Sequence, residues 1–291
     1  MASPRRPRIL VVGLGRLGGA LASQLRRAGF PVWVRTRSVS GRRTAKALRL
    51  KEATESDLRR ARVCFLTVPD GAVAKVAAAV APSLGPGAAL VHCSGALPLD
   101  VLHGPAGGRA TGSFHPLVAV SGAETPLAGH AVAVATRSRW LAPELVRASR
   151  ALGLAPLRVP EAGRGAYHAG AALVASGLVA LLDAAVETWA AAGVERAAAE
   201  RALLALMRSA LAAVEARGLI RGLTGPVVRG DADVVEAHLA RLPADVVPLY
   251  RMLMRRVLRR VSSALARPTA LRLQLLLGPT GRPRRTRARR T

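Results

Sequence analysis

Aromatic residues are scarce in this sequence of 291 residues, where Phe, Trp and Tyr together make up 3%. Its core must therefore be packed from small aliphatic side chains, which suits the close approach of helices. Only two cysteines occur, Cys64 and Cys93, and there is no CxxC pair. Both lie in apolar runs, so we interpret them as buried free thiols and expect no metal site.

Lysine is almost absent, and acidic residues are few. Lys46, Lys51 and Lys75 are the only lysines, so nearly all of the formal net charge of +27 comes from arginine. Such a charge invites a nucleic-acid interpretation. However, the arginines are scattered along predicted helices, and such a bias often reflects the base composition of the coding DNA. We therefore expect no specific nucleic-acid partner. The one dense cluster, GRPRRTRARRT at residues 281–291, predicts a disordered basic tail over residues 279–291.

Long hydrophobic runs are also lacking. A long uncharged and apolar stretch, AYHAGAALVASGLVALL at residues 166–182, is slightly short for a membrane span and rich in small residues. The N-terminal ILVV superficially resembles a signal peptide, but it is short, Arg16 follows it closely, and no small-residue cleavage site is present. We therefore expect a cytoplasmic protein with no membrane partner, in which residues 166–182 form a buried helix.

Apolar strand-like segments alternate with helical segments in the first half of the chain. The alternation predicts an α/β fold with a doubly wound parallel sheet of the Rossmann type, over residues 1–160. After Pro160 there is no convincing strand, and long helical periods predict an all-helical second domain over residues 161–278.

The segment RILVVGLGRLGG, residues 8–19, has the spacing G-x-G-x-x-G between a predicted strand and a predicted helix. Gly13 would allow the tight turn, Gly15 would let the backbone approach a pyrophosphate, and Gly18 would let helix and strand pack closely. The alternative is a glycine-rich turn without a ligand. We predict a dinucleotide site that also uses the intervening residues Leu14, Arg16 and Leu17.

The next strand indicates which dinucleotide is bound. NAD enzymes usually end this strand with an acidic residue that holds the ribose hydroxyls, whereas here it ends in Arg35, Thr36, Arg37 and Ser38. Two guanidinium groups and two hydroxyls suit a 2′-phosphate, and no acid is present to repel it. The sequence therefore favours NADP(H), although an arginine-rich surface loop is the alternative.

Later strand ends should face the same crevice. Val68 and Pro69 are predicted to line its adenosine side, and Asp70 to cap the following helix. Cys93 and Ser94 should lie near the nicotinamide. His115, at another strand end, is a candidate for proton transfer or a structural histidine.

The helical domain supplies the remaining candidates. His168 and Ser176 share one helix face, which could face the nicotinamide or could instead be buried among neighbouring residues. We assign Tyr167, Ser176 and Arg229 to substrate binding. Arg229 could alternatively fix a helix–helix corner next to Asp231, which we predict as a helix N-cap.

Seven stretches in this order carry a family resemblance that extends from Ile9 to about Leu242: GLGRLGGALA, LTVPDGAV, VHCSGALPLDVL, GSFHPL, YHAGAALVAS, GLTGPVVRGD and VEAHLARL. The chain resembles a family that joins a Rossmann-like oxidoreductase module to a helical domain of unknown function (number twenty-five twenty). That family looks related to pyrroline-5-carboxylate reductase, deazaflavin-dependent NADP reductase and the β-hydroxyacid dehydrogenases. The resemblance implies NADP binding, a helical dimerisation domain and a reductase activity.

Two residues depart from the family pattern. Gly177 stands where members usually have Asn after the serine of the helix motif. The lysine that β-hydroxyacid dehydrogenases use as general acid/base in this helix is also missing, so that mechanism cannot be carried over.

We therefore expect an NADP(H)-dependent oxidoreductase that acts on a small carbonyl, imine or hydroxy compound, with Ser94, His115 and His168 as catalytic residues. It would form a homodimer through the helical domain. One alternative is an NADP(H)-binding sensor without turnover. Another is an arginine-rich protein associated with nucleic acid, with a vestigial Rossmann domain.

Overall fold

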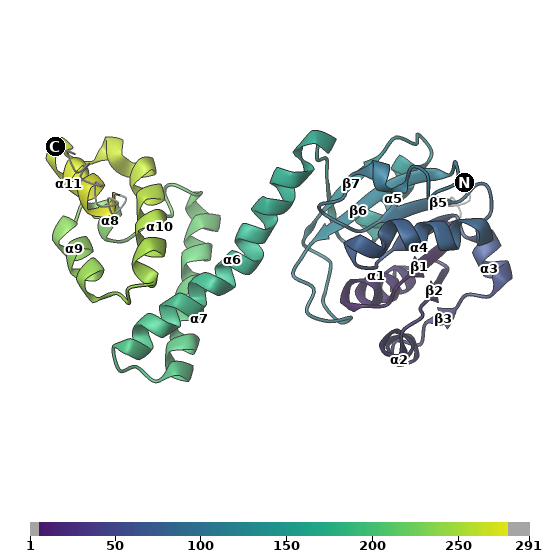
Figure 1. Ribbon diagram of the computed structural model, residues 1–291, viewed down its shortest axis with the longest axis horizontal. Coiled ribbons are helices and arrows are strands. Elements are labelled where there is room, and N and C mark those ends of the chain that lie inside the picture. The colour runs from purple at the N-terminus through teal and green to yellow at the C-terminus, as the bar shows by residue number, and fades with distance from the viewer. Residues whose placement is uncertain (1–5, 279–291) are drawn as a thin grey trace, which may run out of the picture. The chain divides into compact units, whose positions relative to one another are not determined.

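The structure, a computed structural model, describes residues 6–278 and divides into two compact units (Figure 1). The first unit ends at Ala175 and the second begins at Ser176, so the division falls inside α6 (Arg164–Ala191). The predicted domain boundary lay just before this helix. The first turns of α6 belong with the first unit because Arg164 and Tyr167 hydrogen-bond to Ser113 and His115 of one of its strands. The predicted tail, residues 279–291, lies outside the described residues.

An eight-stranded sheet forms the centre of the first unit, with the order β3-β2-β1-β4-β5-β6-β7-β8. The strands are β1 (Ile9–Val12), β2 (Val32–Arg35), β3 (Lys51–Glu52), β4 (Val63–Leu66), β5 (Ala89–His92), β6 (Ala110–Leu117), β7 (Ala131–Thr136) and β8 (Ala155–Leu157). The sequence missed β3, which is two residues long and polar. β2 and β3 lie on one side of β1 and the later strands on the other side, as in doubly wound sheets.

The expectation of a parallel sheet is wrong at one pair of strands. β1 to β6 pair in parallel, but β6 and β7 are antiparallel, with His115 opposite Ala133. β7 and β8 are again parallel to each other. Parallel neighbours need a connection that crosses over the sheet, usually through a helix. Residues 118–130, which connect β6 to β7, contain no helix, so the two strands run antiparallel.

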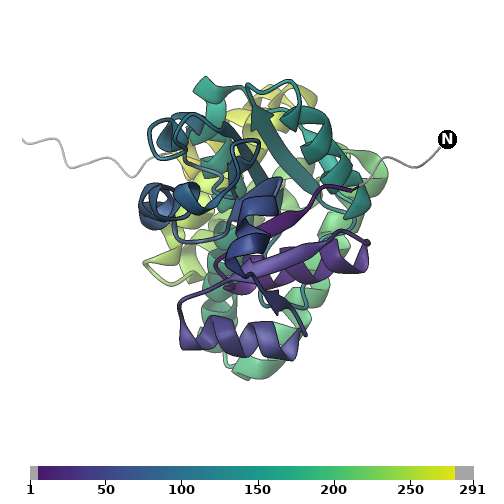
Figure 2. The same ribbon diagram turned by 90° about the vertical axis from the view of Figure 1, so that its right-hand side faces the viewer.

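Helices cover both faces of the sheet (Figures 1 and 2). One face packs against α1 (Arg16–Arg27), α2 (Val39–Ala47) and α5 (Leu141–Ala151), and the other against α3 (Glu55–Arg60) and α4 (Val73–Val80). Short 3-10 turns follow β4, α4 and β5 and precede α6, at Asp70–Ala72, Ala81–Ser83, Leu99–Leu102 and Glu161–Gly163. The sequence did not predict α3, whose six residues contain a single buried side chain, Leu58.

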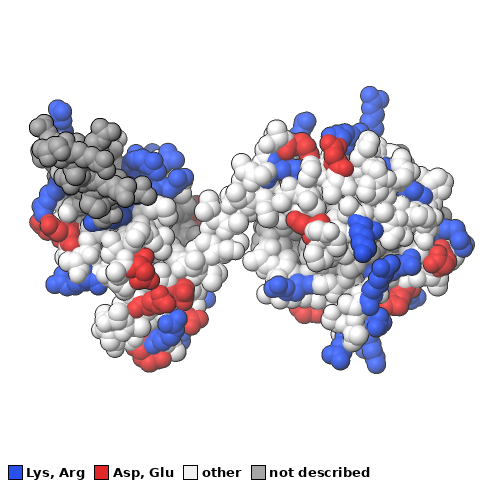
Figure 3. Space-filling view, in the orientation of Figure 1, with Lys and Arg blue, Asp and Glu red and all other residues white. Residues whose placement is uncertain are grey.

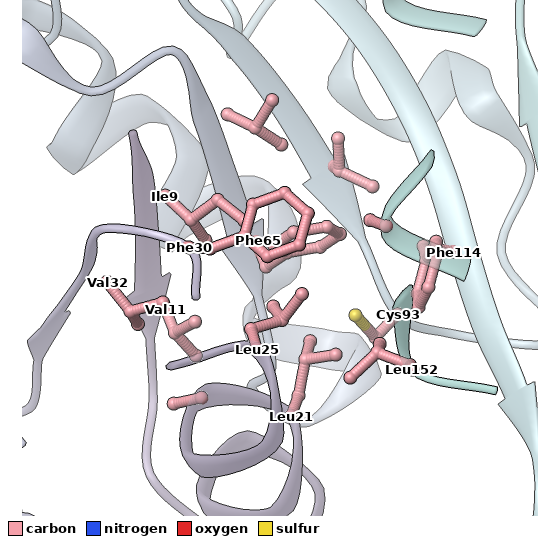
Figure 4. Packing of buried hydrophobic residues seen from close by; sticks show 14 of the residues in the cluster. Ile9, Val11, Leu21, Leu25, Phe30, Val32, Phe65, Cys93, Phe114 and Leu152 are labelled. Carbon is pink, nitrogen blue, oxygen red and sulfur yellow. The ribbon is translucent and has the colours of Figure 1, made fainter. Parts of the chain in front are cut away.

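The few aromatic residues are used at the centre of the larger core (Figure 4). All three phenylalanines lie in one cluster, and the rings of Phe65 and Phe114 meet edge to face with centroids 5.3 Å apart. Small aliphatic side chains from α1, α5 and the strands fill the space around them. This agrees with the expectation of a mainly aliphatic core.

The second unit contains helices and no strand among residues 176–278, as predicted. Besides the remainder of α6 it contains α7 (Arg196–Arg217), α8 (Pro226–Arg229), α9 (Ala232–Arg241), α10 (Val246–Val261), a 3-10 turn (Ser262–Ala264) and α11 (Arg267–Leu277). Its main core joins α8, α9, α10 and α11. Asp231 takes the N-cap position of α9, but its carboxylate does not cap the helix and instead pairs with Arg229 at 2.7 Å.

The predicted burial of the helix at residues 166–182 is wrong. Leu173, Val174 and Val179 on α6 are 76%, 70% and 65% exposed. Residues 161–191 are long and apolar enough to cross a membrane, and only 6% of their most apolar window is buried. A helix that is apolar on all sides needs neighbours on all sides. Here α7 covers it mainly around Val186.

Candidate functional site

The glycine turn follows β1 and is held by the next strand of the sheet. Gly13 has a φ of +93°, in the region that favours glycine. The Thr67 hydroxyl, just beyond β4, donates hydrogen bonds to the carbonyl oxygens of Gly13 at 2.7 Å and Val12 at 3.1 Å. The turn is thus fixed by backbone conformation and by a side chain from β4.

The other two glycines have different surroundings. A methyl group at Gly18 would collide with the carbonyl oxygen of Gly13 and lie 2.6 Å from the Thr67 hydroxyl, so close packing requires glycine there. A methyl group at Gly15 would meet nothing within 4 Å. Gly15 is the N-cap of α1, whose first turn contains no acidic residue. The open space at this helix N-terminus is therefore suited to a phosphate group.

The end of β2 carries the residues predicted to bind a 2′-phosphate. Arg35 is half-buried, and its Nη1 lies 3.9 Å from a carboxylate oxygen of Glu55 on α3. The expectation that no acid is present is therefore wrong, because a later helix brings one close. The Ser38 hydroxyl caps α2 by accepting from the backbone N–H of Gly41 at 3.0 Å, and Arg37 is exposed. No acidic residue occurs in the first turn of α2.

Ser94 is buried just beyond β5 and joins two strand ends. Its hydroxyl donates to the Asp70 carboxylate at 2.8 Å and accepts from the backbone N–H groups of Ala96 and Leu97, each at 3.1 Å. The predicted capping role of Asp70 is wrong, since this residue begins a short 3-10 turn whose N-cap is Pro69. Asp70 instead orients Ser94. Pro69 is exposed and Val68 half-buried at the end of β4.

The two cysteines are buried and free, as predicted. Cys93 packs into the core with Phe114 and Leu152 (Figure 4), so its thiol is buried among apolar side chains. Burial raises the pKa of Cys64 to about 12 and raises that of Cys93 as well. Neither thiol is suited to act as a nucleophile, and Cys93 can meet a ligand only through its backbone.

His115, Tyr167 and His168 meet at Gly95. The Nδ1 atom of His115 and the Tyr167 hydroxyl are hydrogen-bonded at 2.8 Å, and the rings of His115 and His168 have centroids 6.0 Å apart. A methyl group at Gly95 would lie 2.6 Å from His168 and 2.7 Å from His115. A glycine at this position therefore makes room for both imidazoles. His168 is exposed, which contradicts the alternative of a buried histidine on this helix.

Arg164 is the charged residue buried deepest in this region, with 3% exposure. Its Nη2 donates to the Ser94 carbonyl oxygen at 2.9 Å and to the Ser113 hydroxyl at 2.8 Å. No carboxylate of the described residues forms an ion pair with it. Its positive charge therefore acts on the groups around it.

Burial and that charge keep His92 and His115 neutral. Burial first, then His168 and Arg164, lower the pKa of His115 to about 4. Burial and Arg164 likewise lower the pKa of His92 to about 4. The pKa of Tyr167 is raised by burial. At neutral pH His92 and His115 are thus neutral, and the Tyr167 phenol keeps its proton.

Two predicted substrate residues lie in the second unit. Ser176 is exposed on α6. The guanidinium of Arg229 bonds to Asp231 through Nε at 2.8 Å and through Nη2 at 2.7 Å. This pairing agrees with the alternative that Arg229 fixes the corner between α8 and α9. The assignment of both residues to substrate stays a prediction.

The first unit thus brings together Ser94, His115, Tyr167 and His168, with the glycine turn on a strand of the same sheet. These groups can hold and move protons. Sequence reasoning missed the roles of Asp70 and Arg164. Asp70 had a signal, since it stands at a strand end like Ser94, whereas nothing in the sequence showed that Arg164 would be buried.

Two known protein domain families match parts of the chain. Residues 8–126 match the NAD binding domain of 6-phosphogluconate dehydrogenase. Residues 132–257 match a domain of unknown function, DUF2520, which therefore begins at β7 and extends through most of α10. No curated protein matches the sequence closely enough to be counted as a relative.

Several solved structures share the fold. A Bacteroides fragilis protein provisionally assigned as an NADP oxidoreductase is 23% identical, with a TM-score of 0.71 over 88% of this chain and 99% of its own. A Thermotoga maritima protein is also 23% identical, with a TM-score of 0.66 over the same shares. The pyrroline carboxylate reductase of Plasmodium falciparum, solved with NADP bound, is 11% identical, with a TM-score of 0.60 over 94% of this chain and 99% of its own.

These similarities agree with the architecture described above. The first unit has a fold of pyridine-nucleotide-binding dehydrogenases and reductases. Residues 8–126 are therefore similar to the NAD binding domain of 6-phosphogluconate dehydrogenase, and residues 132–257 to DUF2520.

Proposed function

We propose that the protein is an NADP(H)-dependent oxidoreductase that transfers hydride to or from a small carbonyl, imine or hydroxy compound. One observation carries the proposal. The proton-carrying cluster of Ser94, His115, Tyr167 and His168 lies at the carboxyl ends of β5 and β6 and the start of α6, in the unit that contains the Gly13–Gly18 turn. Ligands of open α/β sheets bind beyond these strand ends.

The residues of the turn fit a dinucleotide. The space in front of Gly15 would be narrowed by any side chain, and the free N–H groups at the start of α1 would hold the pyrophosphate. A bound nicotinamide would supply or accept the hydride. The protein has to orient the substrate and handle the accompanying proton.

His115 and Tyr167 are suited to that proton. When His115 carries its proton on Nδ1, it donates to the Tyr167 oxygen, and the phenol proton is free for a substrate oxygen or nitrogen. The low pKa of His115 keeps it neutral for this role near pH 7. His168 is exposed and can exchange protons with solvent or substrate. Ser94, fixed by Asp70, would orient the nicotinamide or the substrate.

The preference for NADP(H) is supported by the basic end of β2. Arg35 and Arg37 offer two guanidinium groups, and α2 begins at Ser38 without an acidic residue in its first turn. Glu55 opposes this preference, but its side chain is 63% exposed and 3.9 Å from Arg35, a distance at which it can also orient the guanidinium.

We also propose a cytoplasmic homodimer that forms through the helical domain. The exposed apolar side chains Val179 on α6, and Leu206 and Leu211 on α7, support it, because such patches mark interfaces. Light scattering at micromolar concentration should give twice the mass of the chain, and Val179→Asp should give a monomer. A wild-type monomer, or a chain recovered only with membranes, would contradict this part of the proposal.

The activity is tested with a panel of small oxo acids, imines and hydroxy acids, with the absorbance of the reduced nicotinamide as readout. For an accepted substrate, His115→Ala or His168→Ala should lower turnover by about 10²–10⁴ if that residue is the acid/base. Arg229→Ala tests the role of Arg229. It should lower turnover if Arg229 contacts the substrate, and should leave turnover unchanged if Arg229 only fixes the corner between α8 and α9. Unchanged turnover in both histidine variants would refute the catalytic assignment. Tight NADPH binding without any turnover would favour a sensor.

A further inference from the structure

The C-terminal half of α10 carries arginines that have no acidic partner. Arg255, Arg256, Arg259 and Arg260 occupy its last two turns, and none forms an ion pair within residues 6–278. Three other arginines of the second unit are paired, Arg196 with Asp183, Arg229 with Asp231, and Arg272 with Asp233 and Glu236, whereas others such as Arg208 form no ion pair within the described residues. Basic side chains are prominent on both units in Figure 3. The arginines of α10 differ from others of this unit in their density, since four of them fall within residues 255–260.

These arginines line three hollows that adjoin one another. One, of about 370 Å³, is lined by Arg260, by Arg217 at the end of α7 and by the turn that follows, which contributes Arg221. A second, of about 320 Å³, is lined by Arg256, Arg259 and Arg260. A third, of about 350 Å³, includes Arg259. Arg260 lines the first and second hollows and Arg259 the second and third, so the three are neighbours, and we describe them together as one basic groove.

A groove of this kind is unfavourable without an anion. The guanidinium groups repel one another, and the carbonyl end of α10 offsets only part of this repulsion. Guanidinium binds phosphate through two parallel hydrogen bonds, which makes it the usual side chain for phosphate recognition. A ligand with several linked phosphates could occupy successive hollows at once.

We propose that this groove, which we call the α10 groove, binds a linear chain of phosphates independently of sequence. No aromatic side chain lines any of the three hollows, so the groove offers no platform on which a base could stack. Phosphate groups, from a nucleic-acid strand or from inorganic polyphosphate, are therefore the part of the ligand that is recognised. The α10 groove consists of residues of the second unit, whereas the proposed dinucleotide site consists of residues of the first.

The test measures binding of a fluorescein-labelled oligothymidylate to the full chain by anisotropy, at several salt concentrations. The triple variant Arg256→Gln/Arg259→Gln/Arg260→Gln removes three charges from the α10 groove. The control triple variant Arg27→Gln/Arg137→Gln/Arg196→Gln removes three charges from exposed ion pairs elsewhere. A third protein lacks residues 279–291, which contain further arginines. Circular dichroism verifies that each variant is folded.

We expect the α10 variant to bind at least about tenfold more weakly, and its slope of log affinity against log salt to fall by about 2. The control variant and the shortened chain should stay within about twofold of the wild type. Inorganic polyphosphate should displace the oligonucleotide. If polyphosphate displaces the labelled oligonucleotide at a lower phosphate concentration than unlabelled oligothymidylate does, free polyphosphate is the better ligand. If unlabelled oligothymidylate displaces it at the lower concentration, nucleic acid is the better ligand.

Equal losses of oligothymidylate affinity in the α10 variant and the control variant would overturn the proposal, because the binding would then depend on net charge alone. Loss of binding on removal of residues 279–291 would assign it to the tail instead. Failure of polyphosphate to displace the oligonucleotide would show that bases are read. Binding to vesicles of anionic phospholipid, without oligonucleotide binding, would replace the phosphate chain with a membrane surface. NADPH binding is unaffected in every case.

Discussion

Substitution of Gly15 and Gly18 by alanine separates two roles within one turn. At Gly18 a methyl group would meet backbone that cannot move aside, the carbonyl oxygen of Gly13, and the Thr67 hydroxyl 2.6 Å away. Overpacking of this kind costs about 1–3 kcal/mol of unfolding free energy. At Gly15 the methyl group meets nothing within 4 Å, and the backbone is already extended with φ of −71°.

We therefore expect Gly15→Ala to change the unfolding free energy by less than about 0.5 kcal/mol, since a weaker N-cap is offset by lower entropy of the unfolded chain. Its methyl group would occupy the space where a pyrophosphate approaches. Loss of one hydrogen bond to a charged group costs about 1.5–3 kcal/mol, so NADPH should bind about ten- to a hundredfold more weakly.

Urea unfolding and calorimetric titration with NADPH measure the two effects separately. Gly18→Ala should lower both stability and affinity, whereas Gly15→Ala should lower affinity alone. The reasoning would be refuted if Gly15→Ala destabilised the protein as much as Gly18→Ala does. It would also be refuted if Gly15→Ala bound NADPH as tightly as the wild type.

Three further predictions concern the proton-carrying cluster and the buried His92. Ser94→Ala leaves two backbone N–H groups and the Asp70 carboxylate without their partner, so urea unfolding should show a loss of about 1–3 kcal/mol, and an unchanged value would contradict the hydrogen bonds described. Tyr167→Phe removes the hydroxyl bonded to His115 and should abolish turnover or slow it strongly while NADPH still binds; equal turnover would exclude the phenol as proton donor. The pKa values of His92 and His115 are about 4 in the folded protein and about 6.5 in the unfolded chain. Between about pH 4 and pH 6.5 the unfolded chain therefore binds more protons than the folded protein. The free energy of unfolding should thus fall as the pH is lowered through this range. Unfolding free energies measured at about pH 7.5 and about pH 5 should differ in that sense, and replacement of His115 by Asn should reduce the difference.

The local features of the fold could be predicted from the sequence. The turn at Gly13 depends on residues that are adjacent in the chain, and the strand and helix that flank it have clear hydrophobic patterns. The direction of β7 could not be taken from those patterns, because an apolar strand reads the same in both directions. The absence of a helical segment between β6 and β7 was the available signal, since a parallel connection needs a crossover.

Features that depend on distant parts of the chain were harder to predict. Glu55 approaches Arg35 only because α3 folds back beside β2, and Arg164 is buried only because α6 begins against Ser94 and Ser113. The exposure of α6 was missed for a different reason. An apolar helix is read as buried, but the sequence does not say whether its own chain or a second molecule covers it.

The central claim is that the turn at Gly13 and the basic end of β2 bind NADP(H). A calorimetric titration of the wild-type protein with NADPH, and in parallel with NADH, tests it most directly. We predict tight binding of NADPH and much weaker binding of NADH, with the difference reduced about ten- to a hundredfold in Arg35→Gln/Arg37→Gln. If neither nucleotide bound, the glycine turn would be a turn without a ligand, and the proposed oxidoreductase would be contradicted.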